Sequence, residues 1–147
     1  MNSGGRTRKR VLPKNVRLKR AYAAPAPTDG ARVLVDRLWP RGVSREDAAL
    51  DEWMKEIAPS EALRRWFGHV PARWDEFRRR YAEELRAHDD LVEALRDRAR
   101  RGPLTLVYGA RDEAHNDAVV LRDIILGAEA HASTYRTRGD ARTVDGG

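Results

Sequence analysis

Cysteine is absent from this chain of 147 residues. Without thiols the protein has no disulfide, no thiolate nucleophile and no cysteine ligands for zinc or an iron–sulfur cluster. Any chemistry must therefore come from carboxylates, imidazoles, guanidinium groups or hydroxyls.

The chain also lacks a long apolar run. A membrane-spanning helix needs about 18 consecutive apolar residues, and no segment of the sequence comes near that length. The N-terminus, Met1 to Arg6, is basic but has no apolar segment of the kind found in secretory signals. We therefore expect no membrane partner and a cytoplasmic location.

Several signatures of cofactor, metal and catalytic sites are missing as well. There is no glycine-rich phosphate loop and no G-x-S-x-G turn around a nucleophilic serine. No H-E-x-x-H spacing occurs among the four histidines, His69, His88, His115 and His131. The sequence therefore predicts no metal site, and it identifies neither a cofactor nor a reaction.

Positive charge is concentrated at one end of the chain. The formal net charge is +6, yet residues 1–20 hold eight basic side chains and no acids. The remaining 127 residues carry 21 basic and 23 acidic side chains, a net charge of −2. We expect residues 1–14 to form a basic flexible arm. Either this arm is a solvated tail, or residues 6–20 make a weak, salt-dependent contact with nucleic acid.

The length and the apolar pattern predict a single compact α/β domain over residues 15–128, because about 100–150 residues is the commonest domain size. The pattern of apolar residues predicts strands at 15–20, 31–38 and 104–108. Helical spacing and capping residues predict helices at 45–58, 60–68, 72–87, 90–101 and 113–128. We expect residues 129–147 to be a disordered polar tail.

The order of these elements predicts a small, mostly parallel sheet of about three strands covered by about five helices. The pairing of the first strand is left open, because its connection to the second strand is short and non-helical. A parallel crossover usually needs a dozen or more residues.

Polar side chains gather at the ends of two of the predicted strands. The first group lies at the end of the strand at 31–38 and just past it, and consists of Asp36, Arg37, Trp39 and Arg41. The second group follows the strand at 104–108 and consists of Arg111, Asp112, His115 and Asn116. If the two strands are parallel neighbours, both groups face one crevice at the carboxyl edge of the sheet, where ligands of open α/β sheets bind.

This composition favours a site for a small anion such as a phosphate, a nucleotide or a carboxylate, with hydrolysis as an extension of that hypothesis. Guanidinium groups provide planar forks for such anions, and an imidazole can move protons near neutral pH. The residues expected to bind the ligand are Arg37, Arg41, Arg111, Asn116 and Trp39. The residues expected to orient water or move protons are Asp36 and His115.

Each of these residues also has a purely structural interpretation. Asp36 can be buried in an ion pair with an arginine, which is the usual condition for burying an acid. Asp112 can be the N-cap of the last helix, with Arg111 as a surface ion-pair partner. Trp39 can belong to the core. His69, which follows Gly68, is either a general acid or base or a capping and surface residue.

Four motifs in this order resemble the YeaO-like family of small bacterial proteins, which is built on a domain of unknown function. The motifs are Val16 to Tyr22, Val35 to Gly42, Trp66 to His69 and Tyr108 to Asn116. The resemblance covers residues 15–126 and implies the family's α/β fold.

The wider superfamily carries cysteines and a Cys-His-Arg sequence near the third strand and the final helix. By this resemblance, Tyr108 stands at a cysteine position, and Asn116-Asp117-Ala118 replaces Cys-His-Arg. Thiol or redox chemistry of cysteine-bearing relatives therefore does not transfer to this chain.

Overall fold

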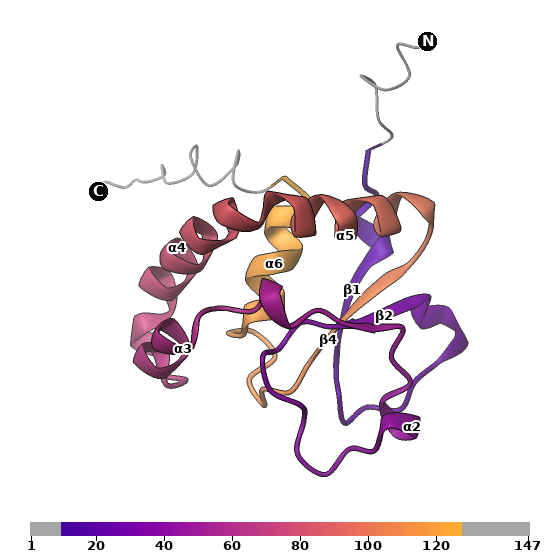
Figure 1. Ribbon diagram of the computed structural model, residues 1–147, viewed down its shortest axis with the longest axis horizontal. Coiled ribbons are helices and arrows are strands. Elements are labelled where there is room, and N and C mark those ends of the chain that lie inside the picture. Colours follow the sequence, from indigo (N-terminus) through magenta and orange to yellow (C-terminus); the bar gives the residue numbers. More distant parts are fainter. Residues whose placement is uncertain (1–9, 128–147) are drawn as a thin grey trace.

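A computed structural model of the protein describes residues 10–127. The arm expected at 1–14 lies mostly outside the described residues, and the tail expected at 129–147 lies entirely outside them. The described part combines one small sheet with helices, as Figure 1 shows.

The sheet has four parallel strands in the order β1-β4-β2-β3. They are β1 Val16–Arg20, β2 Ala31–Leu34, β3 Glu52–Trp53 and β4 Leu104–Tyr108. The helices are α2 Arg45–Ala48, α3 Glu61–Phe67, α4 Trp74–Leu85, α5 Asp89–Arg101 and α6 Asp117–Ile125. The prediction of an α/β domain with a parallel sheet is confirmed, with one strand more than expected and with α2 only a single turn.

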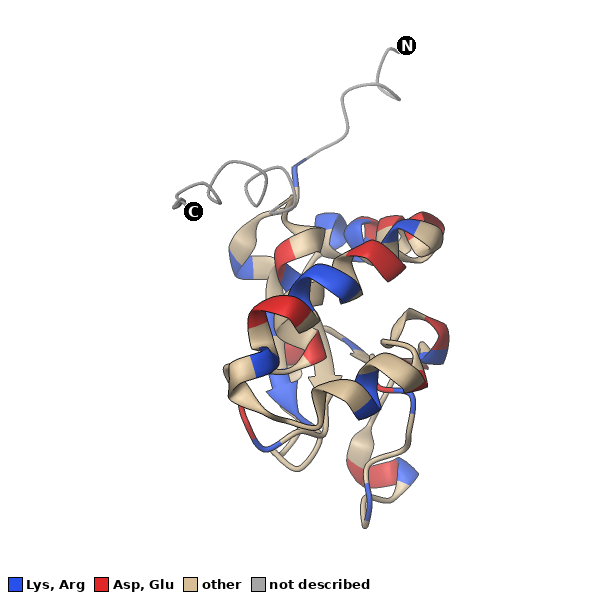
Figure 2. Cartoon of the chain, turned by 90° about the vertical axis from the view of Figure 1, so that its left-hand side faces the viewer, with Lys and Arg blue, Asp and Glu red and all other residues tan. Residues whose placement is uncertain are grey.

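Side chains of successive strand residues alternate between two faces of the sheet. One face carries Val33, Leu104 and Leu106, which are fully buried in the main core together with apolar residues of α3 to α6. These four helices lie on one side of the sheet (Figure 1). Their outer surfaces carry interspersed basic and acidic side chains, as in the exposed ion pair of Arg80 with Glu76 (Figure 2).

The opposite face of the sheet has a small core of its own. Leu34 and Val107 are fully buried there, and Trp39 and Trp53 pack against them with their rings edge to face at 5.3 Å. Helix α2 lies near this face. Its last residue, Ala48, accepts a hydrogen bond at 2.8 Å from a side chain of β2.

A buried ion pair anchors the connection from β1 to β2 on this second face. Asp29 and Arg32 are both about 5% exposed, and their charged groups lie 2.7 Å apart. Lys19 approaches the same carboxylate at 2.9 Å. Burial raises the pKa of Asp29, but the amide of Ala26 and the two cations outweigh it, so the pKa falls below its usual range.

Residues 21–30 show how a short, non-helical connection can join parallel strands. β1 and β2 do not pair with each other, because both pair with β4, one on either side. The connection must pass over β4 and run back along its length, about 17 Å for five strand residues. Ten extended residues reach roughly 33 Å, so the connection is long enough.

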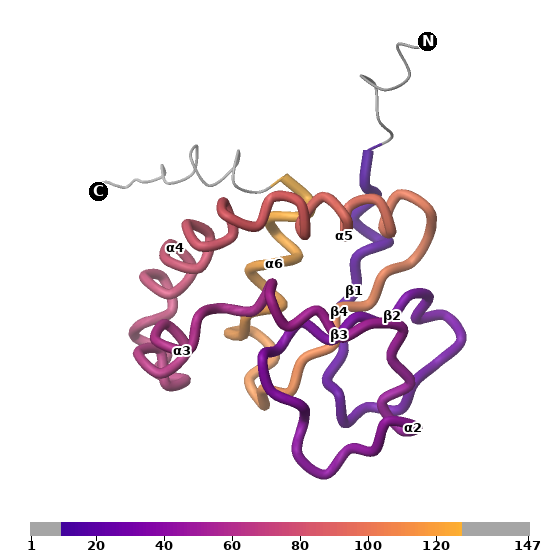
Figure 3. Tube along the Cα trace, in the orientation of Figure 1, coloured from indigo at the N-terminus to yellow at the C-terminus, as the bar shows by residue number. Residues whose placement is uncertain are grey.

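The helix predicted at 45–58 is wrong. Only Arg45–Ala48 is α-helical, with a single 3-10 turn at Lys55–Ile57, and Ala49 ends the α-helix in the left-handed conformation at φ 49°. The chain then returns to the sheet as β3, which pairs with β2 (Figure 3). The spacing of Ala49, Trp53 and Ile57 suited a helix, but pairing with β2 and packing of Trp53 on Trp39 outweigh local propensity.

The start of the last helix is also four residues later than predicted. Helix α6 begins at Asp117 and not near Glu113, and Asn116 is its N-cap, with Oδ1 accepting from the amide of Val119 at 3.1 Å. Asp112 instead closes the preceding turn, where its carboxylate accepts from the amides of Ala114 and His115. The other predicted helices agree with α3, α4 and α5 to within a few residues.

Candidate functional site

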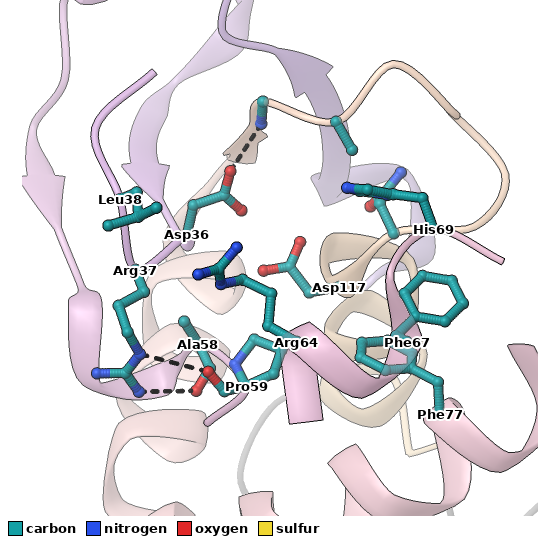
Figure 4. Close-up of a pocket in the computed structure, with 13 residues that line it drawn as sticks. Asp36, Arg37, Leu38, Ala58, Pro59, Arg64, Phe67, His69, Phe77 and Asp117 are labelled. Carbon is teal, nitrogen blue, oxygen red and sulfur yellow. Dashed lines mark hydrogen bonds between the residues drawn. The ribbon is translucent and has the colours of Figure 1, made fainter. Parts of the chain in front are cut away.

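A pocket of about 260 Å³ lies where β2 and β4 end, beside the start of α6 and under α3. Figure 4 shows the side chains that line it. Its lining residues are Asp36, Arg37, Leu38, Ala58, Pro59, Arg64, Phe67, His69, Phe77, Gly109, Ala110, Asn116 and Asp117. This position at the carboxyl edge of a parallel sheet is where ligands of α/β proteins bind.

Asp36 joins the ends of β2 and β4. The chain continues past β2 with the amide of Val35 bonded to Val107, so that Asp36 emerges at the edge of the sheet. Its carboxylate accepts a hydrogen bond from the amide of Gly109 at 2.8 Å. Its carbonyl accepts from the indole of Trp53, also at 2.8 Å. The side chain is thus held in place from two sides.

Asp117, the first residue of α6, faces Asp36 across the pocket (Figure 4). The two carboxyl groups share a hydrogen bond, and the amide of Ala118 also donates to Asp117. Burial raises the pKa of both groups, and the neighbouring charge of Asp36 raises the pKa of Asp117 well above its usual range. Burial and the charge of Asp36 therefore both disfavour the ionised form of Asp117.

Arg64 brings a guanidinium group to this acid pair. Figure 4 shows that group beside the carboxyls of Asp36 and Asp117. Among residues 10–127 it donates no hydrogen bond, and its nearest ion-pair partner is Glu61 at 4.0 Å. The side chain is 46% exposed. Its donors are therefore available to a ligand that enters the pocket.

Helix α3 holds Arg64 in position through a cap that is anchored on α4. Ser60 is the N-cap of α3, with its hydroxyl accepting from the amide of Leu63 at 3.1 Å. Glu84 in turn accepts from the amide and the hydroxyl of Ser60 at 2.8 and 2.6 Å. This confirms the helix start predicted at Ser60.

Apolar side chains form most of the remaining wall. Phe67 and Phe77 stack with their ring centroids 4.4 Å apart. The segment of Ala58 and Pro59 lies opposite, and both residues are buried. Their carbonyls accept long hydrogen bonds, 3.5 and 3.4 Å, from the guanidinium of Arg37. Arg37 thus contributes positive charge but has its donors directed at the backbone.

The structure brings three of the predicted site residues to the pocket: Asp36, Arg37 and Asn116. Asn116 is only 3% exposed and both ends of its amide are in use. Its Oδ1 caps α6, and its Nδ2 donates to the carbonyl of Asp112 at 2.9 Å. Its side chain therefore shapes the pocket and has little left to offer a ligand.

The other predicted site residues lie outside the pocket lining, although β2 and β4 are parallel neighbours as assumed. Arg41 and Arg111 are exposed. Trp39 belongs to the second core, where its indole donates to the carbonyl of Val43 at 2.6 Å. His115 pairs with Asp112 at 2.9 Å and packs edge to face on a tryptophan of α4. The turn closed by Asp112 directs Arg111 and His115 away from the cavity.

Sequence reasoning missed Arg64 and Asp117 and left His69 undecided. Arg64 lies on α3, which falls between β2 and β4 in the sequence, so no spacing along the chain links it to either strand. His69 follows Gly68 in the left-handed conformation, at φ 59°, and lines the open side of the pocket. The only available signal for Asp117 was its place directly after the cap residue of a helix that follows a strand.

The basic residues of 6–20 that the structure describes are in part engaged with the domain. Lys19 pairs with Asp29, and Arg17 donates to the carbonyl of Thr28 at 2.6 Å. Arg20 donates to the carbonyl of Ala110 at 2.9 Å, and so supports the end of β4 beside the pocket.

The fold and the site thus define a small α/β domain with a pocket at the carboxyl edge of its parallel sheet. A family model described as an inactive DUF488-N3 subclade matches residues 15–142. The chain belongs to this YeaO-like branch of the DUF488 family, as the four sequence motifs predicted.

Curated relatives support the assignment. The chain is 46% identical over 109 residues to the uncharacterized protein YeaO of Escherichia coli (strain K12), which covers 74% of this chain and 95% of the relative. It is 44% identical over 117 residues to the uncharacterized protein Rv3073c of Mycobacterium tuberculosis (strain ATCC 25618 / H37Rv), and this match covers 80% of this chain and 98% of the relative. The search of solved structures gave no significant match.

Two further findings concern the described residues alone. Within 10–127 no helix is long and apolar enough to cross a membrane. In the same part of the chain no three histidine, aspartate or glutamate side chains come together as ligands for a metal ion.

Proposed function

We propose that the pocket binds a small-molecule anion without converting it chemically. The observation that carries this proposal is the guanidinium of Arg64, which points into an apolar-walled cavity with no hydrogen bond to any residue of 10–127. A planar guanidinium fork suits the oxygens of a carboxylate or a phosphate.

The charge balance of the pocket favours an anion. Burial and the neighbouring charge of Asp36 raise the pKa of Asp117, which disfavours a second negative charge beside Asp36. Arg37 and Arg64 contribute two positive charges to the lining. An anion in the pocket would face these cations in a partly water-excluded space, where charge interactions are stronger than in water.

Binding without catalysis is supported by the state of the polar groups. The carboxylate of Asp36 is occupied by the amide of Gly109 and by Asp117, and His115 lies outside the pocket. No residue of the lining is therefore placed as an activated nucleophile with its own base. The family model is itself described as an inactive subclade.

The alternative, a nucleic-acid contact through residues 6–20 without catalysis, stays a prediction. No observation on the structure favours it over the pocket, since Lys19 and Arg17 are engaged in contacts with the domain.

A pair of neighbouring arginines provides a direct test. Arg64→Ala removes the guanidinium from the pocket, and Arg65→Ala removes one on the same helix that is 73% exposed and pairs with Glu61 outside the pocket. We expect Arg64→Ala to weaken acetate binding, measured by NMR titration at fixed ionic strength, by about tenfold, the loss typical of a charged hydrogen bond. Arg65→Ala should bind acetate like the wild type. Equal affinities of wild type and Arg64→Ala would refute the proposed site.

A further inference from the structure

The donors around the pocket are few and specific. At the start of α6, where a phosphate would ordinarily find free amides, the amide of Val119 is bonded to Asn116 and the amide of Ala118 to Asp117. The amide of Gly109 is bonded to Asp36. The amides of Val119 and Gly109, at the two strand and helix ends that border the pocket, are thus already bonded within the chain.

The charged groups of the pocket also favour a ligand with a single carboxylate. Arg37 directs its donors at two backbone carbonyls, which leaves Arg64, with Glu61 4.0 Å away, as the guanidinium fork that donates no hydrogen bond among the described lining residues. One fork matches the two oxygens of one carboxylate. The negative charge of Asp36 faces the same space, so a second charge on the ligand would be repelled.

The walls define the rest of the ligand. The stacked rings of Phe67 and Phe77, together with Pro59 and Leu38, enclose an apolar space beside Arg64. A dry cavity of about 150 Å³ is enough for a benzene ring. The pocket here, about 260 Å³, therefore has room for one ring and a carboxylate group, but not for a nucleotide.

We propose that the ligand of this pocket is a monocarboxylic acid with a flat apolar body, and not a phosphate or a nucleotide. The carboxylate binds the guanidinium of Arg64, and the flat body packs against Phe67 and Phe77. This inference rests on the proposed function and narrows it to one class of anion.

Four small probes separate the contributions of charge and body. Benzoate has the flat body and a single negative charge, benzyl alcohol has the body without the charge, acetate has the charge without the body, and phenyl phosphate has the body with a second charge. Each is titrated into the full chain at neutral pH and fixed ionic strength, and its dissociation constant is measured by NMR.

We expect benzoate to bind about tenfold or more tightly than each of the other three probes. Arg64→Ala should remove this preference, and Arg65→Ala should keep it. Arg64→Lys preserves the charge without the planar fork, so it should weaken benzoate binding as well. Tm values of the variants near that of the wild type would show that the fold is intact.

The contradicting results are distinct. If phenyl phosphate binds as tightly as benzoate and depends on Arg64, the carboxylate assignment is wrong while the anion site stands. If acetate binds as tightly as benzoate, the proposal that the ligand has a flat apolar body is wrong. If the binding of none of the charged probes is weakened by Arg64→Ala, the proposed function itself is overturned.

Discussion

At the scale of single residues, the site depends on two carboxyl groups held side by side. Asp36 and Asp117 lie in a pocket whose walls are largely apolar, so the ionised form of the second acid is disfavoured. The pair therefore opposes the accumulation of negative charge beside Arg64.

The raised pKa of Asp117 predicts how stability changes with pH. A group whose pKa is higher in the folded than in the unfolded state stabilises the fold below its unfolded pKa, near 3.8. That contribution is lost as the pH rises through the folded value. Asp117→Asn cannot ionise and can still donate to Asp36. The variant should therefore be more stable than the wild type at pH 8, as measured by urea unfolding.

The control for this prediction is Asp123→Asn. Asp123 lies on the same helix and is partly exposed beside Arg122, at 3.3 Å. Its replacement should change stability by about 0.5 kcal/mol or less. The result that would contradict the prediction is a difference in unfolding free energy between Asp117→Asn and the wild type that is the same at pH 8 as at pH 4.5. In that case the pKa of Asp117 is not raised by folding.

At the scale of secondary-structure elements, the connection from β1 to β2 decides whether the sheet can form. Residues 21–30 pass across β4 on the second face and are fastened there by Asp29, whose carbonyl accepts from Thr105 at 2.7 Å. Gly30 ends this connection at φ 66°, against the carbonyl of Pro103. Both strands that carry the pocket depend on this close approach.

Replacing Gly30 by alanine should therefore be strongly destabilising. The added Cβ would lie 2.2 Å from the carbonyl oxygen of Pro103, in addition to the cost of the left-handed backbone. Gly42→Ala is the matched control, because Gly42 has a similar φ of 80° but nothing within 4 Å of the new Cβ. We expect a loss of about 1 kcal/mol for Gly42→Ala and about 3 kcal/mol or more for Gly30→Ala in urea unfolding. Equal losses of unfolding free energy in the two variants would mean that the backbone near Pro103 can move to accommodate the added Cβ without destabilising the fold.

The elements also show what the sequence can and cannot determine. β1, β2, β4 and the helices α3 to α5 follow from apolar spacing and local caps, and the structure has them close to the predicted positions. β3 could not be predicted, because two residues carry no periodicity and the strand exists only through its pairing with β2. The start of α6 was misplaced because Asp112 and Asn116 both have the chemistry of an N-cap.

At the scale of the whole molecule, the pocket joins three parts of the chain that are far apart in the sequence. The carboxyl edge of β2 and β4 was predictable, since strand ends with polar residues mark the binding edge of parallel sheets. That reasoning placed Asp36 in the pocket. It could not supply Arg64, because the position of α3 over the sheet follows from packing of α3 on α4 and not from any local pattern.

The measurement that tests the account most directly is the location of anion-induced chemical-shift changes in the ¹⁵N-labelled full chain during a benzoate titration. The account predicts the largest changes at the backbone amides around the pocket, at 36–38, 64–69 and 109–117, and their loss in Arg64→Ala. Changes confined to residues 6–20, equal in wild type and Arg64→Ala, would contradict it and would favour the basic arm as the anion-binding element.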